Sequence, residues 1–401
     1  MTESAFILQV RLVQASFHKI EMETLLLHFS ITCNGLVGKV ILLDTFFCVF
    51  NKKAPLRGIM GASRRLRVLL SAAGIVCCVF LIHHLFFAEE YIDMTFHTDP
   101  YSWKCEPPTR LLRTAESLTC IGPKPIFFVE TSDSRRLTAR QACAVESAAY
   151  HHPHMRAHVL FTSPEPLDLT DPYMARLVRI PNVRLLRVEV GVLVSGTPLS
   201  HWYNKGRWRS SPYRALHMSD AMRLTVMWLF GGIYLDMDVV VLKSLSQLHN
   251  TTTTDNGLNV GFALLAFDPA HPLVGAAIRD LARSYRPHEF ASNGPVLFNR
   301  NFRELCAVDN VEELHILGAP CGVGVLAKEE AYPVSYKKWE EYFEARPSPD
   351  NSLIRDSFII HVWNKLSSGG KMVVGQNSLY EEAMRYHCPS VYQQVSEFGY
   401  A

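Results

Sequence analysis

The chain has 401 residues, of which 48% are apolar and 19% are charged, a composition too apolar and too low in charge for a disordered polypeptide. Its 40 basic and 38 acidic residues leave a formal net charge of +2, which gives no electrostatic case for a polyanionic partner. We therefore expect one large or two ordinary folded domains and no nucleic-acid partner.

The first segment with a strong pattern is 68–88, a run of twenty-one residues without Asp, Glu, Lys or Arg. As a helix rising about 1.5 Å per residue, the run spans roughly 30 Å, the thickness of the hydrocarbon core of a bilayer. Arg64, Arg65 and Arg67 precede it and acidic residues follow it, so the positive-inside rule places the N-terminus in the cytosol. We predict a single transmembrane signal-anchor after a cytosolic tail at 1–67. A buried core helix and a cleaved signal peptide are the alternatives.

Upstream of this run, the apolar stretch 35–50 is interrupted by Lys39 and Asp44 and is only sixteen residues long, so we do not count it as a second span. Met60, followed by small residues and the arginine cluster, would begin a short cytosolic tail of ordinary composition. We therefore interpret residues 1–59 as an extension upstream of the start of translation.

Ten cysteines divide into four on or before the predicted span and six after it. An even number on the luminal side fits an oxidising compartment and predicts disulfides, with fifteen connectivities open. No Cys-x-x-Cys pair occurs among the six, which disfavours a structural zinc site. The sequon Asn250-Thr251-Thr252 is a predicted glycan acceptor, because it lies in a polar run on the luminal side.

Residues 89–124 lack sustained periodicity and contain four prolines, which predicts a luminal stem. From residue 125 onward apolar strands alternate with helices, which predicts an α/β domain with a largely parallel sheet over 125–401. Ligands of such sheets bind at the carboxyl ends of the strands. The predicted elements are strands at 126–129, 157–161, 183–190 and 260–267 and a helix at 139–150.

A long helix is predicted over 213–230, because this stretch holds no Gly or Pro and Gly231-Gly232 follows as a stop. Asp220 and Arg223 share one stripe of the helix with apolar neighbours, which puts a carboxylate and a guanidinium on the same face. An exposed ion pair between residues i and i+3 is the alternative interpretation of these two residues.

Next comes an apolar strand, predicted over 233–242 and broken only by Asp236 and Asp238. In an extended chain both carboxylates point to one side, and Met237 points to the other. Two neighbouring carboxylates repel each other unless a cation lies between them, and hard oxygen ligands suit Mg²⁺ or Mn²⁺, which can also bind the diphosphate of a nucleotide. An Asp-x-Asp alone is a weak signal, but its place after Gly-Gly-x-Tyr on an apolar strand strengthens it.

Several segments together resemble the Golgi α1,4-glycosyltransferase family, of the lactosylceramide 4-α-galactosyltransferase and α1,4-N-acetylglucosaminyltransferase type, in the Asp-x-Asp sugar-transferase group. The string SDAMRLTVMWLFGGIYLDMDVVVLKSL at 219–245 is similar to the donor-binding core of that family. The likeness covers about 125–401 and is specific for the class but not for the sugar. The other similar segments, in order, are IFFVETSD at 126–133, CAVESAAYHHP at 143–153, WYNKGRW at 202–208, NGPVL at 293–297, YPVSYKKWEEYFE at 332–344 and HVWNK at 361–365.

The resemblance implies a Rossmann-like nucleotide-sugar transferase domain of the GT-A type behind the single transmembrane helix. It implies a retaining enzyme that moves galactose from UDP-galactose in α1,4 linkage onto a glycosphingolipid such as lactosylceramide. Transfer of N-acetylglucosamine or N-acetylgalactosamine to glycolipid or glycoprotein glycans is one alternative, and an inactive sugar-binding scaffold is another. The protein would be a type II Golgi membrane protein with a UDP-sugar donor and a glycolipid acceptor. A homo- or hetero-oligomer with other Golgi transferases stays open.

The resemblance also assigns roles to residues. Asp236 and Asp238 would hold Mn²⁺ and the UDP diphosphate, whereas Asp220 and Arg223 would bind the donor sugar, so that Asp220, Arg223 and Asp238 are the candidate catalytic residues. No protein nucleophile is evident, which favours front-face attack by the acceptor hydroxyl, with the β-phosphate of UDP as the base.

Further contacts to the substrates are expected around this centre. Glu130, Thr131 and Ser132 follow the first strand and would lie near the uridine. Gly232 would leave room for close approach of a ligand, with Tyr234 packed beside it. Asn293-Gly294-Pro295 and His361-x-Trp363 resemble loops that close over donor and acceptor, and a satisfied strand histidine is the alternative for His361.

Two other clusters are less informative. Trp202, Tyr203 and Trp208 could form a platform for sugar rings, with ordinary core packing as the alternative. The cluster His151-His152-Pro153-His154 resembles a metal site, but Pro153 breaks any helical spacing and no nearby Cys or carboxylate completes it, so we do not predict metal binding there.

Overall fold

The computed structural model describes residues 109–112, 124–254, 256–313 and 321–399. The predicted cytosolic tail, transmembrane span and most of the stem lie outside these residues, as do the six cysteines before residue 121. Within the described ranges, no helix combines the length and the apolar character that crossing a bilayer requires.

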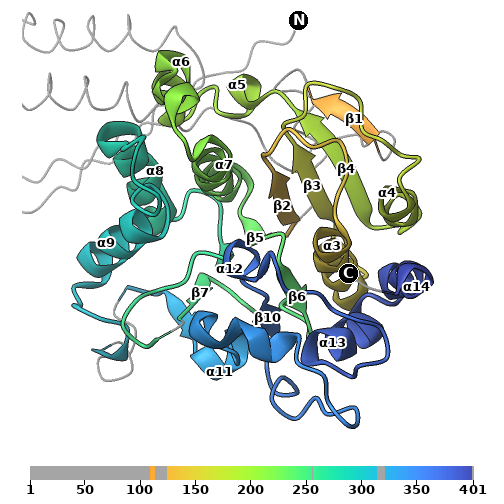
Figure 1. Ribbon diagram of the computed structural model, residues 1–401. Coiled ribbons are helices and arrows are strands. Elements are labelled where there is room, and N and C mark those ends of the chain that lie inside the picture. Colours follow the sequence, from red (N-terminus) through yellow and green to blue (C-terminus); the bar gives the residue numbers. More distant parts are fainter. Residues whose placement is uncertain (1–108, 113–123, 255, 314–320, 400–401) are drawn as a thin grey trace, which may run out of the picture. The chain divides into compact units, whose positions relative to one another are not determined.

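An eight-stranded sheet forms the centre of the described part, with strand order β1-β4-β3-β2-β5-β8-β7-β9. Figure 1 labels β1, β4, β3, β2 and β5, which follow one another across the sheet. The five strands from β1 to β5 in this order are parallel, whereas β8 is antiparallel to both of its neighbours. The α/β class is thus confirmed, and the sheet is mixed. The strands are β1 (Thr109–Leu112), β2 (Ile126–Glu130), β3 (Ala157–Phe161), β4 (Val183–Val188), β5 (Gly232–Leu235), β7 (Thr251–Thr253), β8 (Leu264–Phe267) and β9 (Gly324–Leu326).

Helices cover both faces of this sheet, so its central strands are buried on both sides and their sequences are continuously apolar. In β2, Ile126 and Phe128 face one hydrophobic core while Phe127 and Val129 face the other. One layer consists of α3 (Ala139–His151), α4 (Pro172–Leu177), α13 (Leu379–His387) and α14 (Pro389–Phe398). The other consists of α5 (Val190–Leu193), α6 (Leu199–Lys205), α7 (Arg214–Phe230), α8 (Pro272–Ser284) and α9 (Pro295–Cys306).

A second, two-stranded sheet joins β6 (Val239–Val241) to β10 (Ile359–His361) in antiparallel fashion. β6 follows β5 directly in the chain, and its pairing with β10 brings a C-terminal segment next to the Asp-x-Asp motif. The remaining short elements are η3 (Arg207–Ser210), α11 (Lys328–Ala331), η4 (Tyr336–Tyr342) and α12 (Asn364–Ser367).

Two disulfides confirm the prediction that cysteines after the predicted span pair with one another. Cys143 of α3 bonds to Cys388, which lies between α13 and α14, across 245 residues of sequence. Cys306 at the end of α9 bonds to Cys321, 15 residues further on. The first bond therefore joins the C-terminal helices to the beginning of the domain.

The glycine pair after α7 corrects one expectation. Both Gly231 and Gly232 have positive φ, at +61° and +86°, where residues with a side chain are strained. A Cβ on Gly232 would lie 2.2 Å from the Pro125 carbonyl oxygen. Gly232 thus allows close approach of the neighbouring backbone at the start of β5, and not of a ligand, as the sequence suggested.

The predicted strand 233–242 is also wrong in one respect, because it is two strands joined by a turn at 236–238. The amide of Val239 donates to the Asp236 carbonyl at 3.1 Å, which closes the turn. β5 belongs to the large sheet and β6 to the small one, so Asp236 and Asp238 lie where the chain changes sheets. They are not alternate residues of one extended strand.

Candidate active site

The turn at 236–238 is held at the carboxyl end of β5 by backbone contacts. The amide of Asp236 donates to the Ala263 carbonyl at 2.9 Å, and the Val362 amide donates to the Asp238 carbonyl at 2.9 Å. In the register of the small sheet His361 is the partner of Val239. Strand pairing therefore places His361 beside the Asp-x-Asp motif, 123 residues from Asp238 in sequence.

Asp236, Asp238 and His361 form a group of three potential metal ligands, each offering one atom, with all three atoms within 4.8 Å of one another. Two carboxylates and one imidazole are a donor set that suits a divalent ion of intermediate softness. The chemistry of these donors therefore fits the metal that the motif predicts. His361 is the last residue of β10, so the expected closing loop is wrong and the alternative of a strand histidine gives its place, but the sequence did not indicate its membership of this group.

Asp238 is the more tightly held of the two carboxylates. Its Oδ1 lies 3.1 Å from His361 Nε2, and its Oδ2 accepts a hydrogen bond of 2.8 Å from the Asn364 amide. Burial raises the pKa of Asp238, but the histidine and the amide outweigh burial and lower that pKa. Burial lowers the pKa of His361, and the Asp238 carboxylate more than compensates and raises it.

Asp236 is held by two side chains that converge on a single oxygen. Tyr234 donates its hydroxyl to Oδ1 at 2.7 Å, and Arg223 Nη2 lies 3.0 Å from the same atom. The Arg223 guanidinium also lies 4.7 Å from the centre of the Tyr234 ring. Although burial lowers the pKa of Arg223, the neighbouring carboxylates raise it further, so the guanidinium stays charged. With Oδ1 occupied in this way, Oδ2 of Asp236 is left for a ligand.

Arg223 also contacts Asp220, at 3.6 Å from Oδ1. The two residues are only 4% and 1% exposed, so the alternative of an exposed helical ion pair is wrong. Oδ2 of Asp220 has no hydrogen-bond partner among the described residues, and a Cβ on Gly294 would lie 2.5 Å from Oδ1. Burial raises the pKa of Asp220 to about 7, with Arg223 opposing the shift.

The loop after β2 is ordered by its own hydrogen bonds. Glu130 is 5% exposed and accepts from the Ser132 amide at 2.7 Å and from Gln141 Nε2 at 2.7 Å. Thr131 donates its hydroxyl to the Ala215 carbonyl at 2.7 Å, which ties the loop to α7. Because β2 and β5 are adjacent and parallel, this loop lies at the same edge of the sheet as Asp236. Contact of Glu130, Thr131 or Ser132 with a nucleotide stays a prediction.

The predicted closing loop at 293–295 is not a free loop. Asn293 is 1% exposed and exchanges hydrogen bonds with the backbone of Arg286 at 2.7 and 2.8 Å. Gly294 packs against Asp220, and Pro295 begins α9. Asn293 therefore holds the segment in shape next to Asp220, and contact of Asn293 or Gly294 with the substrates stays a prediction.

The predicted sugar platform is wrong for Trp202, which is 3% exposed and packs edge-on against Tyr285 in the core. Tyr203 and Trp208 are half-buried and stack with ring centres 5.2 Å apart. Core packing thus accounts for Trp202, and the other two rings are already stacked on each other.

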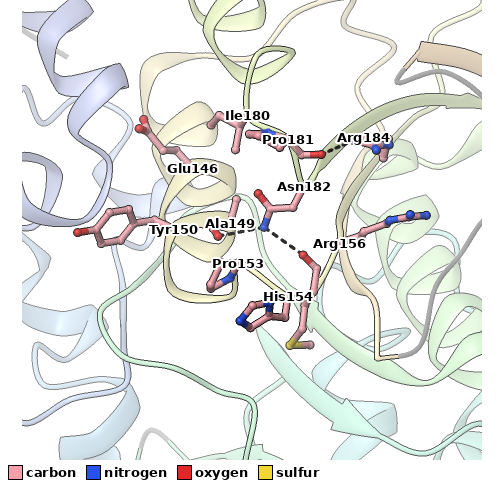
Figure 2. Close-up of a pocket in the computed structure, with 11 residues that line it drawn as sticks. Glu146, Ala149, Tyr150, Pro153, His154, Arg156, Ile180, Pro181, Asn182 and Arg184 are labelled. Atoms are coloured by element: carbon pink, nitrogen blue, oxygen red, sulfur yellow. Dashed lines mark hydrogen bonds between the residues drawn. The ribbon is translucent and has the colours of Figure 1, made fainter.

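A cavity of about 580 Å³ lies away from this group, and Figure 2 shows the residues around it. Its wall includes residues just before β3 and β4 and residues at the end of α3, so it lies at the amino edge of the parallel strands. The Asp-x-Asp turn follows the carboxyl end of β5, at the opposite edge. The cavity is lined by Glu146, Ala149, Tyr150, Pro153, His154, Met155, Arg156, Ile180, Pro181, Asn182 and Arg184.

The α/β fold and the Asp-x-Asp group at a strand end agree with two family models. Residues 138–255 match a glycosyltransferase sugar-binding region containing a DXD motif, and residues 266–395 match an alpha 1,4-glycosyltransferase conserved region. The protein is therefore a glycosyltransferase with a DXD motif.

Similar proteins of known name define the family of this chain more narrowly. It is 33% identical over 284 residues to the lactosylceramide 4-alpha-galactosyltransferase of Mus musculus, covering 69% of this chain and 77% of that one. It is 32% identical over 339 residues to the same enzyme of Homo sapiens, covering 80% and 94%. The alpha-1,4-N-acetylglucosaminyltransferase of Homo sapiens is 30% identical over 278 residues, covering 67% and 80%. The chain belongs to the alpha 1,4-glycosyltransferase family.

Proposed function

We propose that this protein moves galactose from UDP-galactose, with retention, in α1,4 linkage onto a glycosphingolipid such as lactosylceramide. The observation that carries the proposal is the Asp236, Asp238 and His361 group. It lies in a chain about one third identical, over most of its length, to enzymes named for that reaction.

The proposal includes an architecture. Residues 125–401, together with β1 at 109–112, which pairs with β4, would be a catalytic domain of the GT-A type in the Golgi lumen, the rest of 89–124 a stem, and residues 68–88 the membrane anchor. The apolar run in the sequence and the lipid-linked acceptor of the relatives support this arrangement.

Mn²⁺ is the proposed metal, held by Asp236, Asp238 and His361. A bound divalent ion offsets the negative charge that develops on a departing nucleoside diphosphate. The protein's own contribution is to orient the ligands in advance. Tyr234 and Arg223 fix Asp236, while the Asn364 amide fixes Asp238. Such partners of ligating residues govern how well a site binds its metal.

Retention through a covalent intermediate requires a carboxylate free to attack the anomeric carbon. Asp236 and Asp238 are assigned to the metal. Asp220 is 1% exposed, has a pKa raised to about 7 and lies beside Arg223, so it is better suited to hold a sugar hydroxyl than to act as an anionic nucleophile. We therefore propose front-face attack, in which the acceptor hydroxyl approaches on the side from which UDP departs.

A second candidate is transfer of N-acetylglucosamine or N-acetylgalactosamine, which the 30% identity to an alpha-1,4-N-acetylglucosaminyltransferase favours. A sugar-binding scaffold without activity is disfavoured, because a buried charged cluster such as Asp220, Arg223 and Asp236 is costly to keep without a use.

The test is an assay of the full-length chain in detergent-solubilised membranes with Mn²⁺, lactosylceramide and three donors offered singly: UDP-galactose, UDP-N-acetylglucosamine and UDP-N-acetylgalactosamine. We expect transfer of galactose, with an α1,4 linkage identified by NMR of the product. Transfer from only an N-acetylhexosamine donor would establish the second candidate. Absence of transfer from every donor in a folded preparation would support the interpretation as an inactive sugar-binding scaffold.

A further inference from the structure

Trp363 has an unusual backbone conformation beside the metal group. Its φ of 58° and ψ of 47° lie in the left-handed region, which is unfavourable for a residue with a bulky side chain. Two contacts hold it there. The following amide, of Asn364, donates to Asp238 Oδ2 at 2.8 Å, and the indole Nε1 donates to the Val334 carbonyl at 3.0 Å. Such strain persists where the surroundings impose it and is concentrated at functional sites.

The conformation fixes the indole against a metal ligand. The ring centres of Trp363 and His361 are 4.0 Å apart. His361 lies two residues before Trp363 and Asn364 directly after it, and both bond to the Asp238 carboxylate. The position of the indole relative to the Asp-x-Asp motif is therefore determined by the same hydrogen bonds that orient the motif.

Tyr336, the first residue of η4, extends this aromatic surface. Its ring meets Trp363 edge-to-face with centres 6.0 Å apart, and 39% of the residue is exposed. Tyr332 supports Trp363 from a buried position, with centres 5.2 Å apart. Tyr336 and the half-buried Trp363, whose ring planes meet at 69°, thus form an aromatic corner beside the metal group, which we name the aromatic platform. Lys337 Nζ lies 5.8 Å from the centre of the Tyr336 ring.

We propose that the aromatic platform binds a hexopyranose ring of the acceptor by stacking and thereby determines acceptor specificity. One face of a galactose or glucose ring is lined by C–H groups and is apolar, and it matches the electron-rich face of an aromatic ring. A platform fixed relative to the metal group would orient the acceptor hydroxyl toward the donor, which is the main contribution of positioning to such a reaction. This inference rests on the proposed function. It places the acceptor sugar on the aromatic platform and not on Trp202, which is buried in the core.

The test compares Tyr336→Ala, Tyr336→Phe and Tyr386→Ala in the full-length chain, with UDP-galactose and a water-soluble β-lactoside. Tyr386 is a matched control, because it is 55% exposed and belongs to α13. We expect Tyr336→Ala to raise the KM for the lactoside about tenfold. The KM for UDP-galactose and the slow hydrolysis of UDP-galactose without acceptor should not change. Tyr336→Phe keeps the ring and should match the wild type, as should Tyr386→Ala.

An unchanged lactoside KM in Tyr336→Ala would overturn the proposal, and so would a rise in the donor KM of the same size. These outcomes are distinct from failure of the proposed function, because that failure appears in the wild type, as absence of galactose transfer. Trp363→Phe provides a second measurement. A loss of lactoside affinity with retained hydrolysis of UDP-galactose supports the platform, whereas loss of both assigns Trp363 to the metal group alone.

Discussion

The two edges of the parallel strands differ in whether their titratable side chains form a cluster of contacting charges. At the carboxyl edge Asp220, Arg223 and Asp236 are ionisable groups packed together with Tyr234, and Arg223 contacts both carboxylates. At the amino edge burial lowers the pKa values of two histidines, to about 3 for His158 and to about 4 for the half-buried His387, and the buried Glu146 carboxylate accepts hydrogen bonds from the amides of Ser390 and Val391.

This difference indicates that the carboxyl edge serves the reaction and the amino edge stabilises the fold. A charged group buried in a protein is costly unless it is paired, so the carboxyl edge keeps a costly arrangement that a metal and a nucleotide sugar would use. Neutral histidines need only hydrogen bonds or packing. His152, for example, contacts the Ala148 carbonyl at 2.7 Å through Nδ1 and accepts from the Leu245 amide through Nε2. Changes at the carboxyl edge should therefore affect activity, and changes at the amino edge should affect stability.

The largest effect is expected from Asp238→Asn, which keeps the shape of the side chain and removes its charge. We expect transfer to fall by a factor of about 1,000 or more, because one metal ligand and the partner of His361 are lost together. The melting temperature should change little. Asp268→Asn, an exposed carboxylate after β8, is the control and should keep full activity. Wild-type rates in Asp238→Asn would remove the metal role of the motif.

The disulfide between Cys143 and Cys388 should show the reverse behaviour. Replacing both cysteines by serine releases the helices α13 and α14 from α3, and we expect a loss of about 2–5 kcal/mol in the free energy of unfolding. At a temperature where the variant is still folded, KM and kcat should match the wild type. Denaturant titration with a parallel activity assay measures both quantities. A large loss of activity without a loss of stability would contradict a purely structural role of this bond.

Tyr234→Phe should have a smaller effect, confined to the carboxyl edge. It removes the hydroxyl that donates to Asp236 at 2.7 Å and leaves the ring in place under Arg223. We expect the affinity for Mn²⁺ to fall about tenfold, as is usual when the partner of a metal ligand is removed. Calorimetric titration of the metal measures this directly. An unchanged affinity would show that Arg223 alone is sufficient to orient Asp236.

The smallest effect concerns pH at the amino edge. Burial, together with Arg156 and Arg184, lowers the pKa of His158 from 6.5 to about 3, so the fold favours the neutral ring. This contribution to stability is fully present above pH 6.5 and is lost as the pH falls toward 3. The loss in the free energy of unfolding should amount to about 1 kcal/mol at one pH unit below 6.5.

His158→Leu should flatten the fall in melting temperature between pH 7 and pH 5, because neither ring nitrogen of His158 has a hydrogen-bond partner among the described residues. His154→Leu, an exposed neighbour at the same edge, should leave that fall as steep as in the wild type. An equal slope in all three proteins would show that other groups govern acid stability.

Local pattern was sufficient for the regular elements near the site. The strand at 157–161 has the predicted bounds, and the helix predicted at 213–230 begins one residue later, at Arg214. Apolar runs and glycine stops are properties of neighbouring residues, so they can be recognised in the sequence. The turn at 236–238 could not be recognised, because its cause is the pairing of β6 with a strand more than a hundred residues away.

Contacts between segments far apart in the sequence also explain the wrong predictions about site residues. Asn293 and Trp202 are polar or aromatic residues within segments that resemble a transferase, and nothing in their local sequence shows that they are buried. The alternative of an exposed Asp220 and Arg223 pair failed for the same reason, since burial depends on α7 packing against the sheet and α8.

The sequence alone determined the α/β class, several of the strands and helices and the pair of aspartates, because these depend on periodicity and short motifs, and its resemblance to known transferases indicated the class of the protein. The tertiary structure decided that His361 completes the metal group, that Arg223 bridges Asp220 to Asp236, and that Trp363 lies rigidly beside them. These contacts join side chains from separate segments, and their distances and burial are fixed only when the sheets and helices pack together.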